Sequence, residues 1–169
     1  MKTAAQQKGF TLIELLVVIG ILAILFSIVL IAINPARQFG QANDTKKRSD
    51  VLQILNSIHQ YAAENSGQLP ANMPAKPAVG QPANTKSFSW DGASVVANNG
   101  NICDKILSTY ISAIPVAPTV NNGAGLGVGL TSCTAAYQTG YSLTVDDAGR
   151  VTVSSDLPDV NGQPIKITR

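Results

Sequence analysis

The stretch KGFTLIELLVVIGILAILFSIVLIAI, residues Lys8–Ile33, decides the fold of this chain. From Leu15 to Ile33 the residues are apolar, and only Gly20 and Ser27 interrupt them. As a helix with a rise of about 1.5 Å per residue, this part would measure roughly 28 Å, close to the ~30 Å hydrocarbon thickness of a bilayer. We therefore expect a transmembrane helix near the N-terminus.

A secretory signal peptide and a buried helix of a soluble core are the two alternatives to a membrane span. The apolar region of a signal peptide is only about 7–15 residues long and is followed by a small-residue cleavage site. The present run is longer, and no clear site of that kind follows it. A core helix of a soluble protein is rarely apolar on every face, so a membrane span fits best.

Glu14 is an acidic residue within this apolar stretch. A charged side chain deep in a membrane costs about 2.5–3.5 kcal/mol on insertion scales, and such residues are usually functional. In one interpretation Glu14 lies at the interface and its carboxylate reaches water. In the other, cleavage between Gly9 and Phe10 creates an ammonium group one turn away, which pairs with Glu14 of the same or a neighbouring copy.

The segment KGFTLIELLVVIGILAIL, residues 8–25, resembles the N-terminal signature of type IV pilins and of the pseudopilins of type II secretion. The resemblance implies a prepilin with a class III signal peptide, which a membrane-bound prepilin peptidase cleaves after Gly9 and then methylates on Phe10. The acidic residue that sets subunit register in that family falls on Glu14. The similarity covers roughly residues 8–33 and extends less tightly to about residue 65.

The chain is 169 residues long and divides into four predicted parts. These are a leader peptide (1–9), an apolar membrane and assembly helix (10–33), an amphipathic helix (34–66) and a globular β-rich head (67–169). The amphipathic part is expected because apolar residues recur at three- and four-residue spacing after Asn43 and stop before Ser66-Gly67. We predict an α+β fold, in which a long helix, half transmembrane and half amphipathic, packs on a small antiparallel sheet.

Gly20 and Pro35 are the predicted positions of a helix kink. Pro35 removes an amide donor and clashes with the carbonyl of the preceding turn, so a kink or local melting is expected there. Alternatively, Asn34 caps a new helical segment and Pro35 begins it.

Several shorter elements are predicted in the head. The proline-rich residues 67–86 indicate an extended loop, and four glycines between Asn122 and Gly129 indicate a surface loop without the Lys-Ser/Thr ending of a phosphate-binding loop. Helical spacing from Ile102 to Ile114, before Pro115, predicts a short helix. The predicted strands are Ser87–Trp90 and Ala93–Ala97 around a turn at Asp91-Gly92, a hairpin of Tyr141–Val145 and Arg150–Ser154, and an edge strand at Pro164–Thr168.

Cys103 and Cys133 are the two cysteines of the chain, and both lie in the head. An even pair beyond a membrane segment fits a disulfide in an oxidising compartment. Its loop of about 30 residues would stabilise the fold by roughly 3–4 kcal/mol. Two buried free thiols are the alternative.

Catalytic and metal-binding chemistry is weakly indicated. His59 is the single histidine and is expected to be solvated or interfacial, so neither an enzyme nor a cofactor is predicted. Oxygen-rich side chains near the C-terminus are weak calcium candidates, although ordinary Asp/Asn-Gly turns explain them too. These candidates are Asp146, Asp147, Asp156 and Asp159.

The charge distribution bears on orientation and partners. Removal of Lys2 and Lys8 with the leader would leave ten basic and ten acidic residues, so nucleic acid is not expected as the main partner. The positive-inside rule is ambiguous, because the basic triplet Lys46-Lys47-Arg48 lies on the other side of the span. The resemblance implies that the head lies outside. The triplet itself is expected to be a solvated face, or else a contact with acidic lipid or a neighbouring subunit.

The resemblance implies a structural subunit of a type IV pilus-like filament rather than an enzyme. The precursor would span the cytoplasmic membrane once and then enter an extracellular fibre. The implied partners are other copies of the chain, the prepilin peptidase, the assembly platform with its ATPase, and membrane lipid before assembly. A secretion pseudopilin, a minor pilin that binds DNA or a surface receptor, and an unprocessed membrane-anchored domain remain as alternatives. Twitching motility, adhesion, DNA uptake and secretion are the roles open to such a fibre.

Overall fold

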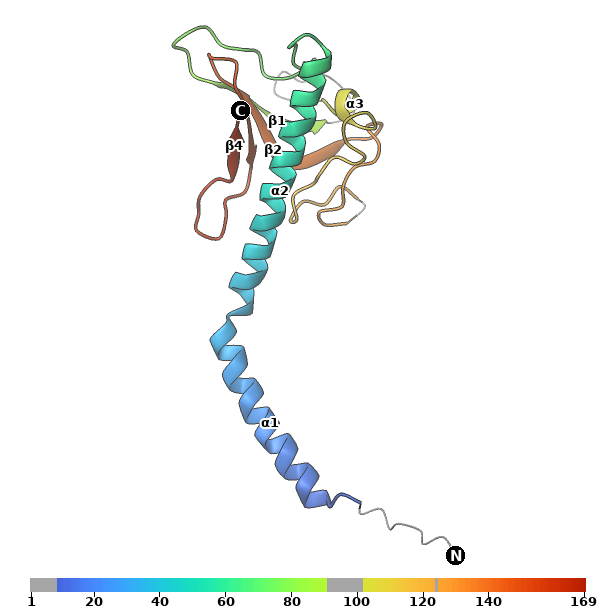
Figure 1. Cartoon of the computed structure of the whole chain (residues 1–169), viewed down its shortest axis with the longest axis vertical. Coiled ribbons are helices and arrows are strands. Elements are labelled where there is room, and N and C mark those ends of the chain that lie inside the picture. The colour runs from blue at the N-terminus through green and yellow to red at the C-terminus, as the bar shows by residue number, and fades with distance from the viewer. Residues whose placement is uncertain (1–8, 91–101, 124) are drawn as a thin grey trace, which may run out of the picture. The chain divides into compact units, whose positions relative to one another are not determined.

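The structure is a computed structural model that describes residues 9–90, 102–123 and 125–169. The chain divides into two compact units, Met1–Phe39 and Gly40–Arg169. The fold is α+β: a long N-terminal helical region is followed by a small four-stranded antiparallel sheet (Figure 1). The predicted fold class is therefore confirmed.

Two helices follow each other directly at the N-terminal end. Helix α1 spans Leu12–Ile33 and continues through Gly20, whereas helix α2 spans Pro35–Glu64. Between them Asn34 takes a left-handed conformation with φ 43° and ψ 76°, and its side-chain Oδ1 accepts a hydrogen bond of 3.4 Å from the Arg37 amide. Asn34 thus caps α2 and Pro35 is its first residue, where a missing amide hydrogen costs nothing. The helix is interrupted at Asn34, which agrees with the alternative that Asn34 caps a new helical segment and Pro35 begins it.

The sheet lies entirely in the second unit. Its strands are β1 (Asn84–Trp90), β2 (Tyr137–Val145), β3 (Val151–Ser155) and β4 (Lys166–Thr168), in the spatial order β1-β2-β3-β4. All neighbouring strands are antiparallel. The predicted hairpin is confirmed as β2–β3, and the predicted last strand is β4.

The core of the second unit forms between α2 and the inward side of the sheet. From α2 it receives Val51, Ile54, Leu55 and Ile58, which are fully buried. Along β2 every second residue is buried, as expected for a strand with one face on a core. Phe88, Tyr141, Leu143, Val145 and Val153 supply the strand side of this cluster.

The prediction of a helix from Ile102 to Ile114 is wrong. Helix α3 spans only Cys103–Ile106, because Leu107 is extended and Ser108 has a positive φ of 67°. The Ser108 amide then donates to the Ile111 carbonyl at 2.8 Å. Ile111 and Ile114 are still buried, so their helical spacing reflects a folded loop that presents both side chains to the core.

The remaining predicted elements of the head are two strands, a turn and a glycine-rich loop. The predicted strand Ser87–Trp90 is the C-terminal part of β1, which pairs with β2 and begins earlier, at Asn84. The predicted strand Ala93–Ala97 and the turn at Asp91-Gly92 lie outside the described residues. The glycine-rich residues after Asn122 contain neither helix nor named strand where they are described.

Candidate functional site

The start of α1 is built by a reciprocal cap between Thr11 and Glu14. The Thr11 amide and hydroxyl donate to Oε2 of Glu14 at 2.8 and 2.7 Å, and the Glu14 amide donates to Thr11 Oγ1 at 3.3 Å. This capping box satisfies amide groups that a helix start would otherwise leave without partners. The carboxylate therefore belongs to the first turn of the helix, rather than to the middle of the apolar run.

Thr11 is the residue of this site that sequence reasoning missed. The available signal was the spacing Thr-x-x-Glu directly before an apolar run, which is a capping-box signature. With Thr11 as its N-cap, α1 begins at Leu12. Local hydrogen bonds therefore explain why the helix begins two residues after Phe10.

Phe10 and Glu14 meet beside the first turn. They line a hollow of about 280 Å³ together with Leu15 and Val18. Phe10 is 88% exposed, and, chain neighbours aside, no atom of the described residues lies within 4 Å of a Cβ placed on Gly9. The Gly9–Phe10 bond is thus accessible in the described residues, and the Phe10 backbone lies one turn from the carboxylate.

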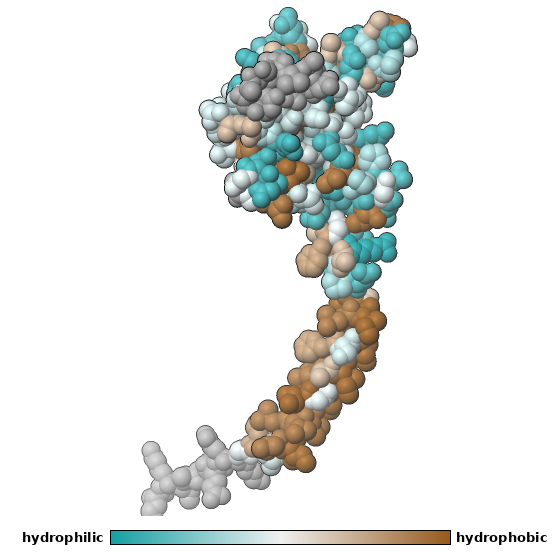
Figure 2. Space-filling view, turned by 180° about the vertical axis from the view of Figure 1, so that it is seen from behind, coloured by the Kyte–Doolittle hydropathy of each residue, from teal (hydrophilic) through white to brown (hydrophobic). Residues whose placement is uncertain are grey.

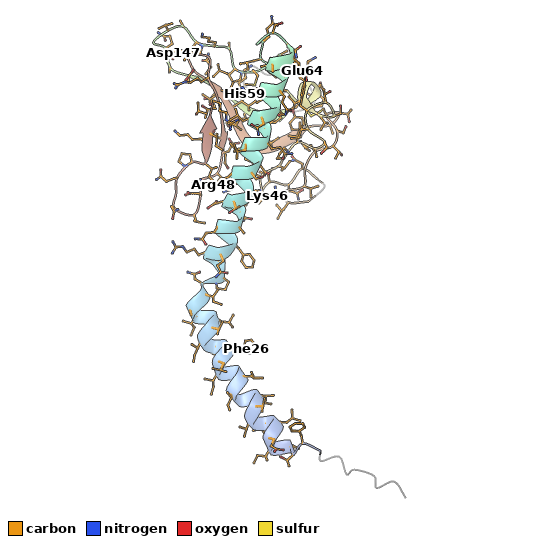
Figure 3. The ribbon with its side chains drawn as sticks, viewed as in Figure 1. Phe26, Lys46, Arg48, His59, Glu64 and Asp147 are labelled. Atoms are coloured by element: carbon orange, nitrogen blue, oxygen red, sulfur yellow. A yellow bond between two sulfur atoms is a disulfide. The ribbon has the colours of Figure 1, made fainter. Side chains whose placement is uncertain are left out.

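The surface of α1 is apolar on all sides. No side chain of this helix is buried by the described residues, and by length and composition the helix can cross a membrane. Figure 2 shows the visible face of α1 as mostly hydrophobic with a few pale patches, and in Figure 3 the labelled Phe26 projects outward from the helix. Ser27 donates its hydroxyl to the Ala23 carbonyl at 2.8 Å, which satisfies that polar group within the helix. Such a surface requires lipid or other apolar chains around it.

The prediction that the basic triplet Lys46-Lys47-Arg48 is a solvated face is wrong for Lys47. Its side chain is buried, and Nζ lies 3.3 Å from Oδ1 of Asp44 and 2.9 Å from the Pro158 carbonyl. The other oxygen of Asp44 accepts from the Val160 amide at 2.8 Å. This buried pair attaches α2 to the loop between β3 and β4, over a sequence separation of more than a hundred residues.

Lys46 makes a second attachment of α2 to the head. Its Nζ lies 3.0 Å from Oδ2 of Asp50 and 2.9 Å from the Val116 carbonyl, and the Tyr141 hydroxyl donates to the same Asp50 oxygen at 2.7 Å. Burial raises the pKa of Tyr141 far above its ordinary value, and the hydrogen bond to the Asp50 carboxylate raises it further. Of the triplet, the solvated prediction fits Arg48 best, because its side chain is 63% exposed.

The four calcium candidates are not gathered into one site. Asp146 and Asp147 lie in the β2–β3 turn, whereas Asp156 and Asp159 lie beyond the other end of β3, so the strand separates the pairs by roughly 13–17 Å. Among the described residues no group of three acidic, histidine or cysteine side chains could hold a metal ion. The structure therefore does not bring the four weak calcium candidates together.

Each of these aspartates instead has a local hydrogen-bonding role. Asp146 accepts from the amide and Nε of Arg150 at 2.8 and 2.7 Å, and the Arg150 amide is the main cause of its lowered pKa. Asp159 accepts from the Gln163 and Asn161 amides, which lower its pKa, and Arg48 contributes. Asp147 accepts from the Gly80 amide at 3.0 Å, and Asp156 accepts from the Ser142 hydroxyl.

Cys103 and Cys133 form a disulfide, with their Cα atoms 5.8 Å apart. It joins α3 to the segment that leads into β2. Cys103 is fully buried, so the bond adds a covalent link at the edge of the hydrophobic core.

His59 lies on α2, close to the core (Figure 3). The residue is half-buried, and its Nε2 atom is buried without a hydrogen-bond partner among the residues that the structure describes. The expected solvated or interfacial position is therefore correct only for part of the ring. No described cysteine or acidic residue joins it in a metal site.

Comparison with known protein families identifies the N-terminal segment. Residues 5–30 match the family model of the prokaryotic N-terminal methylation motif. This motif is the class III signal peptide of type IV pilins, and it indicates a prepilin-type protein. The match covers most of α1 and none of the head. No curated protein and no solved structure matches the chain.

Proposed function

We propose that this chain is the precursor of a filament subunit, cleaved between Gly9 and Phe10, methylated on Phe10 and assembled through α1. The observation that carries the proposal is the coincidence of the methylation motif with a helix that buries none of its own side chains. A prepilin peptidase is the enzyme that this motif implies. The precursor is a single-pass membrane protein with its head outside, and the processed subunit enters an extracellular fibre.

The physical basis of assembly is an exchange of one apolar environment for another. Before assembly, lipid surrounds the Leu, Ile and Val side chains of α1; afterwards, the same side chains of neighbouring copies do. Extraction from the membrane then need not expose α1 to water, where each fully exposed large side chain would cost about 1.5–3 kcal/mol. The apolar helix serves as both membrane anchor and assembly element.

Glu14 sets the register of that packing. In the precursor its carboxylate is held by Thr11. Cleavage produces an ammonium group on Phe10, which shares a hollow with Glu14. In the filament the carboxylate of one copy pairs with the ammonium of its neighbour, because a misaligned subunit would leave two buried charges without partners.

Replacement of Glu14 tests the assembly role. We expect Glu14→Ala to leave cleavage largely intact and to impair filament growth severely, measured by electron microscopy and by subunit mass. Glu64→Ala is a matched control, because Glu64 is an exposed glutamate of the head that accepts a hydrogen bond from Tyr110. Normal filaments from Glu14→Ala would remove Glu14 from its proposed role.

Replacement of Gly9 tests the cleavage site. We expect Gly9→Leu to block processing, so that the subunit keeps residues 1–9. Gly20→Leu is the control for processing, since α1 has open space for a side chain at that position. A normally shortened Gly9→Leu subunit would contradict the cleavage assignment.

Filament length and abundance separate the three finer roles within this proposal. Long surface fibres in which this chain is the main protein would establish a pilus subunit. Short structures that remain in the envelope would establish a secretion pseudopilin. A tip-located minor pilin would be processed in the same way but would be scarce in the fibre.

A further inference from the structure

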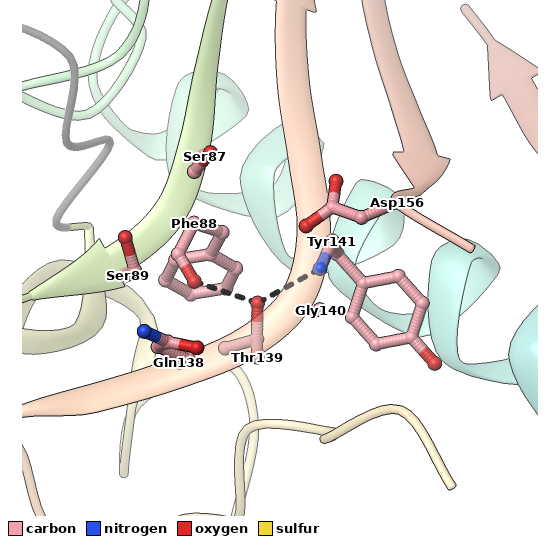
Figure 4. Close-up of a pocket in the computed structure, with 8 residues that line it drawn as sticks. All are labelled: Ser87, Phe88, Ser89, Gln138, Thr139, Gly140, Tyr141 and Asp156. Carbon is pink, nitrogen blue, oxygen red and sulfur yellow. Dashed lines mark hydrogen bonds between the residues drawn. The ribbon is translucent and has the colours of Figure 1, made fainter. Parts of the chain in front are cut away.

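Two adjoining hollows lie where β1 meets β2, and both are lined by Gln138. The first has a volume of about 200 Å³ and includes Ser87, Ser89, Gln138 and Asp156 in its wall. Figure 4 shows the two serines on one side of it and Asp156 on the other. The second has a volume of about 390 Å³ and is lined by Trp90, Asn121, Asn122, Ala136, Tyr137 and Gln138. We call the two hollows together the outer groove.

A break in strand register creates the first hollow. Ser87 pairs with Ser142 and Ser89 pairs with Gln138, so Phe88 alone stands opposite residues 139–141 of β2. The buried Thr139 fixes this bulge, because its hydroxyl donates to the Phe88 carbonyl at 2.6 Å and accepts from the Tyr141 amide at 3.2 Å. A bulge of this kind turns side chains away from the regular pleat and is frequent near binding sites.

The chemistry of the outer groove is polar and nearly uncharged. Its described lining offers serine hydroxyls, carboxamides and an indole, and Asp156 supplies the charge. The absence of lysine and arginine from this described lining disfavours a phosphate polymer, which is held mainly by basic side chains. Hydroxyls and carboxamides both donate and accept, as a ligand rich in hydroxyl groups requires.

Asn122 supplies an independent sign of a missing polar partner. Its Oδ1 accepts from the Gln138 amide at 2.8 Å, which fixes the orientation of the carboxamide. The Nδ2 group is buried and has no hydrogen-bond partner among the described residues. Buried polar groups in native structures are nearly always paired, so this unpaired donor behind the wall of the hollow points to a partner that the described residues do not supply, such as a buried water.

The surface beside the groove has the same character. Thr85, Thr144, Thr152 and Thr168 stand opposite one another in a row across all four strands. The hydroxyls of Thr85 and Thr144 lie 2.9 Å apart, and those of Thr152 and Thr168 lie 2.7 Å apart. Each hydroxyl can take part in further hydrogen bonds. The outer face of the sheet is therefore rich in hydroxyl groups, and Lys166, opposite Ser154 on β4, adds a positive charge to the same face.

We propose that the outer groove binds a neutral oligosaccharide, such as a segment of a surface polysaccharide. Trp90, which is partly buried against the core, supplies the apolar part of the lining, the exposed Gln138 offers its carboxamide to sugar hydroxyls, and the Asp156 carboxylate accepts from further hydroxyls. Gln138 contacts the ligand in both hollows. None of the residues that line the groove belongs to α1.

The single tryptophan of the chain, Trp90, makes the proposal directly measurable. The full chain is purified in a detergent without a sugar headgroup and titrated with cellotetraose, chitotetraose and maltotetraose. We expect a saturable change in Trp90 fluorescence with at least one of these probes. Gln138→Ala should weaken that binding by about tenfold or more, because the exposed Gln138 side chain lines both hollows.

Gln163→Ala is the matched control, because Gln163 is an exposed glutamine on the loop before β4. It should bind like the unaltered chain, and far-UV circular dichroism should show that both variants are folded. A fluorescence change with none of the three probes, or equal binding by Gln138→Ala, would overturn the proposal. A signal that depends on protein concentration alone would do so too, because it would assign the groove to contacts between copies.

Discussion

Helix α1 and the whole second unit, Gly40–Arg169, called the head in this comparison, differ in where their stabilising contacts are. The head buries a continuous core between α2 and the sheet, and Asp44, Lys46, Lys47 and Asp50 have partners within the unit. No side chain of α1 is buried, although its residues are the most apolar of the chain. The head is therefore specified by contacts within one chain, whereas α1 depends on surroundings that lipid or other copies provide.

The largest expected effect comes from a charge placed in α1. Ile24→Asp should abolish filament formation, because a carboxylate near the centre of the span costs about 2.5–3.5 kcal/mol per copy in lipid. The urea unfolding midpoint of the head, followed by Trp90 fluorescence in detergent, should stay unchanged. A shifted midpoint would show that α1 and the head are energetically coupled. This result would contradict the view that the head is stabilised independently of α1.

The largest effect on the stability of the head itself is expected from its buried lysine. Lys47→Met should lower the free energy of unfolding by about 3–5 kcal/mol, because it leaves the Asp44 carboxylate buried without its cation. Arg48→Met is the matched control and should cost less than about 1 kcal/mol, since that side chain is exposed. Equal effects of the two substitutions in urea unfolding would contradict the buried-pair assignment.

A smaller effect is expected from the disulfide. Cys103→Ser combined with Cys133→Ser should destabilise the head by roughly 2–4 kcal/mol, because the unfolded chain regains the freedom of the closed loop. Processing at Gly9 should not change, and this can be checked by subunit mass. Loss of processing in the double variant would show that the head influences the N-terminal site.

The smallest effect concerns pH and Asp146. Its folded-state pKa is lowered, so its contribution to stability is present above the unfolded-state pKa and is lost as pH falls through the folded-state value. Asp146→Asn should therefore lower stability slightly at neutral pH, where the ionised carboxylate contributes, and should flatten the acid limb of the stability profile below about pH 4, where that contribution is already being lost. An unaltered acid limb in urea titrations at several pH values would remove Asp146 from this role.

The two regions also differ in how far the sequence predicted them. The span of α1 and the β2–β3 hairpin were predictable, because composition, alternation and turn residues are local signals. The role of Lys47 was not, because Pro158 and Val160 come close to the Lys47–Asp44 pair only in the folded head. The prediction of a helix as far as Ile114 was wrong for the same reason. The core buries Ile111 and Ile114 from a loop, and their positions in the sequence happen to have helical spacing. Only the Thr11 cap was local and still missed.

The mass of the mature subunit tests the central claim most directly. Native protein from its own membrane or filaments should begin at Phe10, carry one methyl group on that amine and lack residues 1–9. A native subunit that retains Met1–Gly9 and never polymerises would contradict the account, because α1 would then be a membrane anchor and nothing more.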